Sequence, residues 1–223
     1  MRDITFHNIR QHILHALTYV KWGRFRDMRP KNVDSNLYNY HLKALIKDGY
    51  VEHNKTKGYR LSPLGLYYAE QTSSENFKMC QKPKIITMSY IENEKREVLL
   101  WCQPRQPFIN AWALINGKVH YEDESIESAA KREIDSFINK PIQTIRQAGL
   151  IEVNVKILNN KVTHFIAHIF VINLNDNNIK AEHMKWININ DLSNYKLAPV
   201  AKEIIQLVRS KDTFFYKHFN VDW

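Results

Sequence analysis

A polar stretch near the end of the first third of the chain separates two differently patterned parts. Thr72–Lys84 (TSSENFKMCQKPK) carries no sustained hydrophobic period, whereas periodic apolar segments precede and follow it. Such a break is typical of a boundary between two independently packed units. The sequence therefore predicts a first domain at residues 1–72, a linker at 73–84 and a second domain at 85–223.

The first part has the pattern of helices followed by a short hairpin. Helical periods and helix-start residues precede Gly49, two β-like runs follow it, and Ser62-Pro63 opens one more helix. The order expected is helix, helix, helix, two-stranded hairpin, helix. The clearest of these segments are Phe6–Val20, the helix that starts at Asp34-Ser35, the runs Tyr50–His53 and Gly58–Leu61, and Leu64–Gln71.

Most of the positive charge also lies in this part. The whole chain has a formal net charge of +9, and residues 1–72 contain twelve Lys and Arg against six Asp and Glu, which leaves 12 − 6 = +6. Two thirds of the surplus therefore lies in about one third of the chain. An excess of positive charge that is concentrated in one segment favours a polyanionic partner for the first domain.

The stretch LYNYHLKALIKDGYVEHNKTKGYRLSPLG resembles the recognition helix and wing of bacterial regulators of the ArsR and MarR type, and the resemblance covers Phe6–Gln71. It implies a winged helix-turn-helix domain that binds double-stranded DNA. Side chains on the outer face of the recognition helix reach base edges, and cations on the wing contact phosphates. The expected DNA-binding residues are Ser35, Asn36, Asn39, Tyr40 and Lys43 on the helix, and Lys55, Lys57 and Arg60 on the wing. A protein-interaction role for the same domain stays open.

The second part alternates strand-like runs with two amphipathic helices, which predicts an α+β fold. One strand-like run ends at Asn116-Gly117, and an acidic loop then leads into the first helix. The expected strands are Ile85–Ile91, Glu97–Gln103, Phe108–Leu114, Ala148–Ile157, His164–Val171 and Trp186–Ile189, and the expected helices are Ser125–Ile138 and Pro199–Arg209. For the aromatic tail Asp212–Trp223, docking on the core and a dimer contact stay open.

The series Gly117, Glu124, Arg132-Glu133-Ile134 resembles the Nudix box, whose pattern is G-x5-E-x7-R-E-U-x-E-E-x-G-U, and the resemblance covers about Lys84–Arg209. It implies an α/β/α sandwich with a mixed sheet. It also implies cleavage of a diphosphate bond with divalent cations, usually Mg²⁺, bound by carboxylates on one face of the helix.

The box departs from this pattern where the carboxylates are expected. The positions that the family pattern fills with three carboxylates carry Glu133, Ser136 and Phe137. A hydroxyl is a weak ligand and a phenyl ring is none, so we expect a degenerate box with no bound metal and no other cofactor. Residual hydrolysis with Mg²⁺ stays open, with Glu133 and Glu124 as its catalytic residues. Ligands for it could then come from Glu122, Asp123, Asp135 or Glu152.

Two further departures lie at the ends of the box. The gap from Gly117 to Glu124 is six residues instead of five, and Asn139 stands in place of the closing glycine. Asn accepts a left-handed helix cap, so the helix end is expected to survive. We also expect Glu124 and Arg132 to form an ion pair between loop and helix.

A pocket without its metal still binds ligands, and the resemblance implies a nucleoside-diphosphate-linked compound such as ADP-ribose. The expected ligand-binding residues are Arg105, Phe108, Trp112, Glu124, Arg132 and Glu133. A purely structural role for Phe108 and Trp112 as strand core stays open.

Together these features predict a transcriptional regulator, resembling Nudix-related regulators, whose second domain senses a nucleotide-type metabolite such as a nucleotide sugar. The alternatives are a Nudix hydrolase acting on ADP-ribose or a similar compound, and a non-catalytic adaptor. We expect a cytoplasmic homodimer without a membrane segment, since no apolar run or signal region is present. The two cysteines, Cys80 and Cys102, are expected to be reduced.

Overall fold

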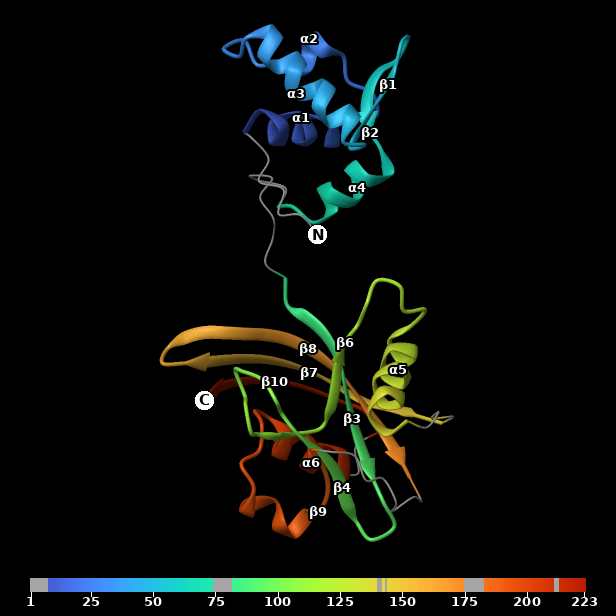
Figure 1. Ribbon diagram of the computed structural model, residues 1–223, viewed down its shortest axis with the longest axis vertical. Helices are drawn as coiled ribbons and strands as arrows, with labels where there is room; N and C mark the ends of the chain where they lie inside the picture. The colour runs from blue at the N-terminus through green and yellow to red at the C-terminus, as the bar shows by residue number, and fades with distance from the viewer. Residues whose placement is uncertain (1–7, 74–81, 140–141, 143, 175–182, 211–212) are drawn as a thin grey trace. The chain divides into compact units, whose positions relative to one another are not determined.

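The computed structural model describes residues 8–73, 82–139, 142, 144–174, 183–210 and 213–223. It divides the chain into two compact units, Met1–Lys82 and Pro83–Trp223 (Figure 1). The division lies inside the linker expected at 73–84, of which residues 74–81 are outside the described residues. Among the described residues, no helix is long and apolar enough to cross a membrane.

The N-terminal unit contains four helices and one hairpin in its described part. In chain order these are α1 (Asn8–Thr18), α2 (Phe25–Met28), α3 (Ser35–Lys47), β1 (Val51–Asn54), β2 (Gly58–Leu61) and α4 (Pro63–Glu70). Asp34 caps α3, because its carboxylate accepts hydrogen bonds from the backbone N–H groups of Asn36 and Leu37. Gly49 ends the helix region with a φ of +82°, which favours glycine.

One hydrophobic cluster holds this unit together. Leu42 and Leu45 of α3 pack with Ile13 and Leu14 of α1, and all four are completely buried. The ring of Tyr38 is buried beside them and meets Phe25 edge to face. Because α3 points these residues inward, its opposite face, which carries Asn36, Tyr40 and Lys43, is exposed to solvent.

The C-terminal unit is built on a mixed sheet of eight strands. The strand order is β10-β7-β8-β3-β4-β5, with β6 also paired to β3 and β9 to β4. Pairing is parallel for β10 with β7 and for β8 with β3, and antiparallel elsewhere. The elements are β3 (Lys84–Glu92), β4 (Glu97–Cys102), β5 (Trp112–Ala113), β6 (Ile115–Lys118), α5 (Ile126–Ile138), β7 (Arg146–Ile157), β8 (Asn160–Asn173), β9 (Met184–Asn188), the 3₁₀ helix η1 (Ile189–Asn194), α6 (Ala201–Arg209) and β10 (Phe215–Asp222).

The two helices of this unit pack on opposite faces of the sheet. Ile134 of α5 lies in a cluster with Ile91 of β3, whereas Ile204 of α6 lies in another cluster with Ile86 of the same strand. Residues 86 and 91 differ by an odd number, so their side chains point to opposite faces. The unit is therefore a mixed α/β fold with one helix covering each face (Figure 1).

Two parts of the second unit differ from the sequence-based expectation, and for a third part the structure favours one of the two open alternatives. The strand predicted at Phe108–Leu114 is wrong for its first half, because only Trp112–Ala113 pair with β4. Asn116 and Gly117, expected to end a strand, lie inside β6 and pair with Met88 and Thr87. The aromatic tail forms strand β10 on the edge of the sheet, so its described residues dock on the core of their own unit.

Candidate functional site

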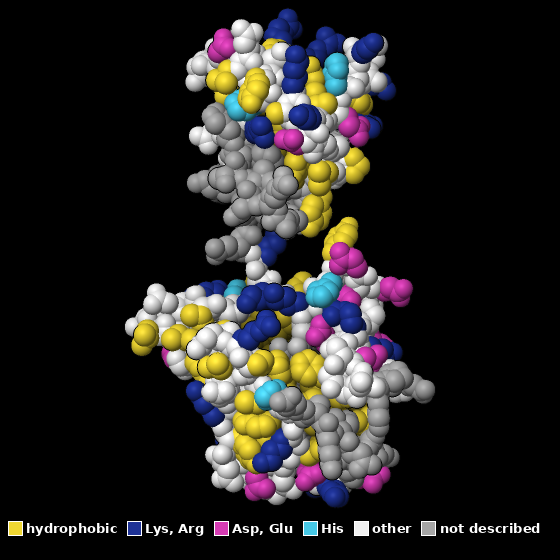
Figure 2. Space-filling model, viewed as in Figure 1, with side chains coloured by type: hydrophobic (Ala, Val, Ile, Leu, Met, Phe, Trp, Pro, Cys, Tyr) yellow, Lys and Arg dark blue, Asp and Glu magenta, His cyan; other side chains and the backbone are white. Residues whose placement is uncertain are grey.

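The exposed face of α3 is the candidate nucleic-acid interface of the N-terminal unit. Ser35, Asn36, Tyr40 and Lys43 are exposed, and Asn39 is half-buried between them. All five side chains that the sequence predicted for this face therefore lie at or near the surface of one helix. Figure 2 shows Lys and Arg side chains spread over the visible face of this unit, with fewer Asp and Glu among them.

The hairpin β1–β2 carries the three expected wing cations, Lys55 and Lys57 in its turn and Arg60 in β2. Lys55, Lys57 and Arg60 are exposed. The guanidinium of Arg60 lies 4.9 Å from the ring centroid of Trp22, and the ammonium of Lys57 lies 5.9 Å from it. Arg60 also donates a hydrogen bond of 2.7 Å to Glu52 across the hairpin. Trp22 therefore joins the cations of the wing to the segment before α2, a contact that charge counting did not reveal.

In the C-terminal unit, α5 is fixed at both ends by local sequence. Ser125 and Ser128 form a reciprocal capping box, in which each side chain accepts from the backbone N–H of the other residue. Asn139 ends the helix in the left-handed conformation, with φ +57° and ψ +31°, as expected for the residue replacing glycine. The face between these caps carries Glu133 and Ser136.

Glu133 lies directly against Gly117 of β6. A Cβ atom built at position 117 would lie 1.9 Å from Cδ of Glu133, so only glycine leaves room for this carboxyl group. The carboxylate accepts a hydrogen bond from the guanidinium of its neighbour, Arg132. The glycine of the motif and its glutamate at position 133 are thus in contact.

Arg132 binds the loop before the helix through Asp123. Its Nε and Nη2 atoms each donate a 2.9 Å hydrogen bond to one oxygen of Asp123, and Nη2 also donates to the backbone oxygen of Lys118. These bonds, with one from the backbone N–H of His120, lower the pKa of the Asp123 carboxyl to about 2. The expected pair of Arg132 with Glu124 is wrong, because Glu124 is exposed and its neighbour Asp123 takes that place.

The two positions after Glu133 on this helix face have other partners. The hydroxyl of Ser136 donates a 2.6 Å hydrogen bond to the backbone oxygen of Glu133. The ring of Phe137 meets the ring of Trp101 edge to face, with centroids 4.8 Å apart. As arranged, positions 133, 136 and 137 present a single carboxylate.

The other carboxylates that the sequence analysis named as alternative metal ligands are bonded to other groups or exposed on the loop. Asp135 accepts from the backbone N–H of Ile142, and Glu152 accepts a 2.8 Å hydrogen bond from His164. Glu122 is exposed on the loop. Within the described ranges, no group of three or more His, Cys, Asp or Glu side chains is arranged to hold a metal ion.

A cavity of about 210 Å³ opens on the side of the sheet that α6 covers, opposite to α5. Gly117 belongs to its wall and also lies against Glu133, whereas Glu133 itself does not line the cavity. Apolar side chains from β3, β8 and α6 form its base, and polar side chains lie among them. The polar and charged members are Lys84, Gln103, Asn116, Lys118 and Thr163.

Of the six expected ligand-binding residues, only Phe108 lines this cavity. Its ring also meets Trp223 edge to face at 5.5 Å, so the end of β10 packs behind the cavity wall. Trp112 packs against Tyr195, which supports its structural alternative, and Arg105 is exposed on the loop before β5. Sequence reasoning missed Lys84 and Lys118, whose only signal was their position at the ends of β3 and β6.

Comparison with known proteins agrees with this architecture. A family model described as NUDIX domain matches residues 82–208, more than half of the chain. The chain is similar to the NUDIX domain of Shewanella oneidensis NrtR complexed with ADP ribose, at 17% identity and a TM-score of 0.52, covering 66% of this chain and 97% of that one. It is also similar to the mMutator MutT protein from Bacillus halodurans, at 18% identity and a TM-score of 0.52, covering 62% and 90%. No curated protein sequence matches the chain.

Proposed function

Because the chain belongs to the NUDIX domain family, we propose that it is a DNA-binding transcriptional regulator whose NUDIX domain binds a nucleotide-type ligand without hydrolysing it. The proposal joins two features of the molecule. One is a helix face on the second unit that presents a single carboxylate. The other is a basic first unit with an exposed polar helix and a cationic hairpin.

The observation that carries the proposal is the occupation of α5 at positions 133, 136 and 137. A hard divalent cation needs several oxygen ligands that converge on one point. Here the carboxylate of Glu133 is bonded to Arg132, the hydroxyl of Ser136 is bonded to the helix backbone, and Phe137 is packed on Trp101. These residues do not fit a catalytic magnesium ion, so we infer that the box is degenerate and that no hydrolytic step passes through it.

The order of elements in the first unit supports DNA binding. Three helices, a hairpin and a fourth helix follow one another in the order expected of a winged helix-turn-helix. In this proposal α3 is the recognition helix and β1–β2 is the wing. Asn39 is suited to bidentate bonding with adenine, and Lys55 and Lys57 are suited to phosphates. The formal charge of +6 on residues 1–72 adds sequence-independent attraction to the duplex.

The lining of the cavity beside Gly117 suits a ligand that has one apolar end and one anionic end. Its volume of about 210 Å³ is smaller than the roughly 300–1000 Å³ of pockets that enclose a whole small molecule. We infer that it holds one ring system and that Lys84 and Lys118, which border it, attract the charged remainder. ADP-ribose, present in the NrtR NUDIX domain structure, is therefore the first probe to use.

DNA binding is tested with the full chain and labelled genomic fragments at several salt concentrations. We expect salt-sensitive, sequence-preferring binding. Asn39→Ala should weaken binding to the preferred fragment by about 10-fold while leaving binding to random DNA unchanged. Lys55→Ala should weaken both and reduce the salt slope by about 1, whereas Lys95→Ala on the second unit should change neither. Binding without any sequence preference would reject the regulator.

Ligand sensing is tested by adding ADP-ribose to the same binding assay. Sensing requires that the ligand change DNA affinity, and coupling energies of this kind are about 1–3 kcal/mol, or about 5–150-fold. In the proposed regulator, two chains pair on one operator and the ligand changes how readily both first units engage it. ADP-ribose that binds without changing DNA affinity would reject the sensing role for this compound.

A hydrolase is the second candidate, because Arg132 and Glu133 are bonded to one another and Glu133 lies against Gly117. It is separated from the regulator by incubating the chain with ADP-ribose and either Mg²⁺ or Mn²⁺ and measuring mononucleotide release. We expect no release above the uncatalysed rate. Release that Glu133→Gln abolishes would establish the hydrolase instead.

A further inference from the structure

Helix α4 of the N-terminal unit is apolar on nearly all sides, yet much of it faces solvent. Seven of its eight residues, Pro63–Ala69, are uncharged and mostly large and hydrophobic. Leu64, Leu66 and Tyr67 remain 46%, 58% and 40% exposed, and only Gly65 is buried. A helix that is apolar all round is normally covered on all sides, so this surface is suited to a contact with another polypeptide.

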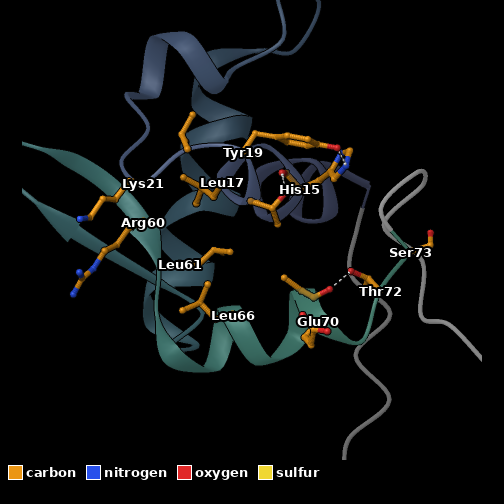
Figure 3. Close-up of a pocket in the computed structure, with 13 residues that line it drawn as sticks. His15, Leu17, Tyr19, Lys21, Arg60, Leu61, Leu66, Glu70, Thr72 and Ser73 are labelled. Carbon is orange, nitrogen blue, oxygen red and sulfur yellow. Dashed lines mark hydrogen bonds between the residues drawn. The ribbon is translucent and has the colours of Figure 1, made fainter. Parts of the chain in front are cut away.

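A groove runs beside this helix. The end of α1, strand β2 and α4 enclose an open space of about 740 Å³, lined at its centre by Leu17, Leu61 and Leu66 (Figure 3). Tyr19 and Val20, at the end of α1, are 70% and 44% exposed and extend the apolar surface. Hydrophobic side chains are also visible in Figure 2 over the position that α4 occupies in Figure 1. None of the expected DNA-reading residues of α3 lines the groove.

The charges of the groove are separated between its two ends. Figure 3 shows Lys21 and Arg60 at one end and Glu70 at the other, with the leucines between them. Arg60 is neutralised by Glu52, whereas Lys21 and Glu70 are exposed, and no ion pair of either side chain is present among the described residues. A surface with one positive end, an apolar centre and one negative end complements itself after rotation about a two-fold axis through the centre.

We propose that a second copy of this chain docks in this groove about such an axis. Leu66 of each copy then packs against the apolar centre of the other, and Glu70 of each copy faces Lys21 of the other. Because the contact is isologous, each charge pair and each apolar contact occurs twice. The assignment rests on the pairing of two chains that the proposed function requires, and it names the surface that makes the pair.

Sedimentation of the full chain, without DNA or ligand, measures this contact directly. The wild-type chain should sediment as a dimer at micromolar concentration. Leu66→Glu places two charges in the apolar centre and should weaken dimerisation at least about 10-fold. The matched control is Leu158→Glu, since Leu158 is 88% exposed on the turn between β7 and β8, and it should leave the dimer unchanged. A monomeric wild type, or equal behaviour of the two variants, would overturn the proposal.

Charge reversal gives a second readout that does not depend on apolar packing. Lys21→Glu and Glu70→Lys should each weaken the dimer, because each places like charges opposite one another at both ends of the contact. The double variant should restore it, because the pairs re-form with their signs exchanged. Absence of this rescue would contradict the two-fold arrangement. DNA binding is measured separately, so a monomer that still binds an operator removes this interface and leaves the DNA-binding function standing.

Discussion

The ring of Phe137 meets the ring of Trp101 edge to face, with 4.8 Å between their centroids. This contact joins α5 to β4 at the position where a NUDIX hydrolase pattern has a carboxylate. Phe137 therefore belongs to the cluster that packs the helix on the sheet, together with Ile134 and Ile138. Phe137 therefore contributes packing at this position, so a carboxylate placed there costs stability.

Phe137→Glu should consequently destabilise the second unit, by about 2 kcal/mol for a half-buried aromatic side chain replaced by a charge. Ser136→Glu introduces the same carboxylate one residue earlier, at an exposed position, and should cost little. Urea denaturation followed by near-ultraviolet circular dichroism compares the two. Equal destabilisation would show that the contact of Phe137 with Trp101 contributes nothing to stability.

Asp123, one residue before the expected glutamate, holds the loop to α5. Asp123→Asn removes the carboxylate that accepts two bonds from Arg132, whereas Glu124→Gln changes an exposed neighbour of the same type. We expect Asp123→Asn to lower the Tm of the second unit by about 3 °C and Glu124→Gln to leave it unchanged. Differential scanning calorimetry of both variants makes the measurement, and the opposite ranking would restore Glu124 as the partner of Arg132.

The Asp123 carboxylate also makes the stability of the second unit depend on pH, and the direction of this dependence follows from its lowered pKa. Hydrogen bonds from Arg132 lower the folded pKa of Asp123 to about 2, below an unfolded value of about 3.9. The stabilisation of the folded state by the Asp123 carboxylate is therefore complete above about pH 5 and is lost as the pH falls from about 4 towards 2. The difference in urea midpoint between wild type and Asp123→Asn should be constant from pH 7 to 5 and should shrink below pH 4. A difference that grows on acidification would contradict the assignment.

The contact of Gly117 with Glu133 predicts a non-additive pair of substitutions. Gly117→Ala places a methyl group where the Glu133 carboxyl lies, so the side chain must turn away from the cavity wall. In a Glu133→Ala background the methyl group meets no carboxyl and should cost less. We expect a coupling of about 1 kcal/mol in a double-mutant cycle measured by chemical denaturation. Additive effects would mean that Glu133 is not packed against Gly117.

Much of the fold was predictable where the signal is local. The cap at Asp34 and the left-handed end at Asn139 follow from side chains that bond their own backbone or accept positive φ. The hairpin around Lys55 follows from alternation on both sides of a polar turn. Each of these elements depends on residues no more than ten positions apart.

The parts that were missed depend on residues far apart in the sequence. Gly117 was expected to end a strand, but it lies within β6 because it pairs with Thr87 of β3, thirty residues earlier. Glu133, sixteen residues later, occupies the space that a side chain at position 117 would need. The tail was left undecided because its parallel pairing with β7 joins Phe215 to Gly149. The choice of Asp123 over Glu124 depends on the path of a loop that is one residue longer than the family pattern, which spacing alone does not determine.

Trp22 provides the last prediction, because two cations of the wing lie over its ring. Cation–π contacts of this kind hold a long side chain in one orientation. At an exposed site, each contact contributes about 0.5–1 kcal/mol. Trp22→Ala should therefore release Lys57 and Arg60 and weaken DNA binding several-fold, whereas Trp22→Phe keeps a ring and should retain most of the affinity. Fluorescence anisotropy with labelled DNA measures both variants, and circular dichroism checks that each remains folded. If both variants bind like the wild type, the ring does not position the wing. If both lose binding equally, Trp22 acts through its indole nitrogen and not through its aromatic face.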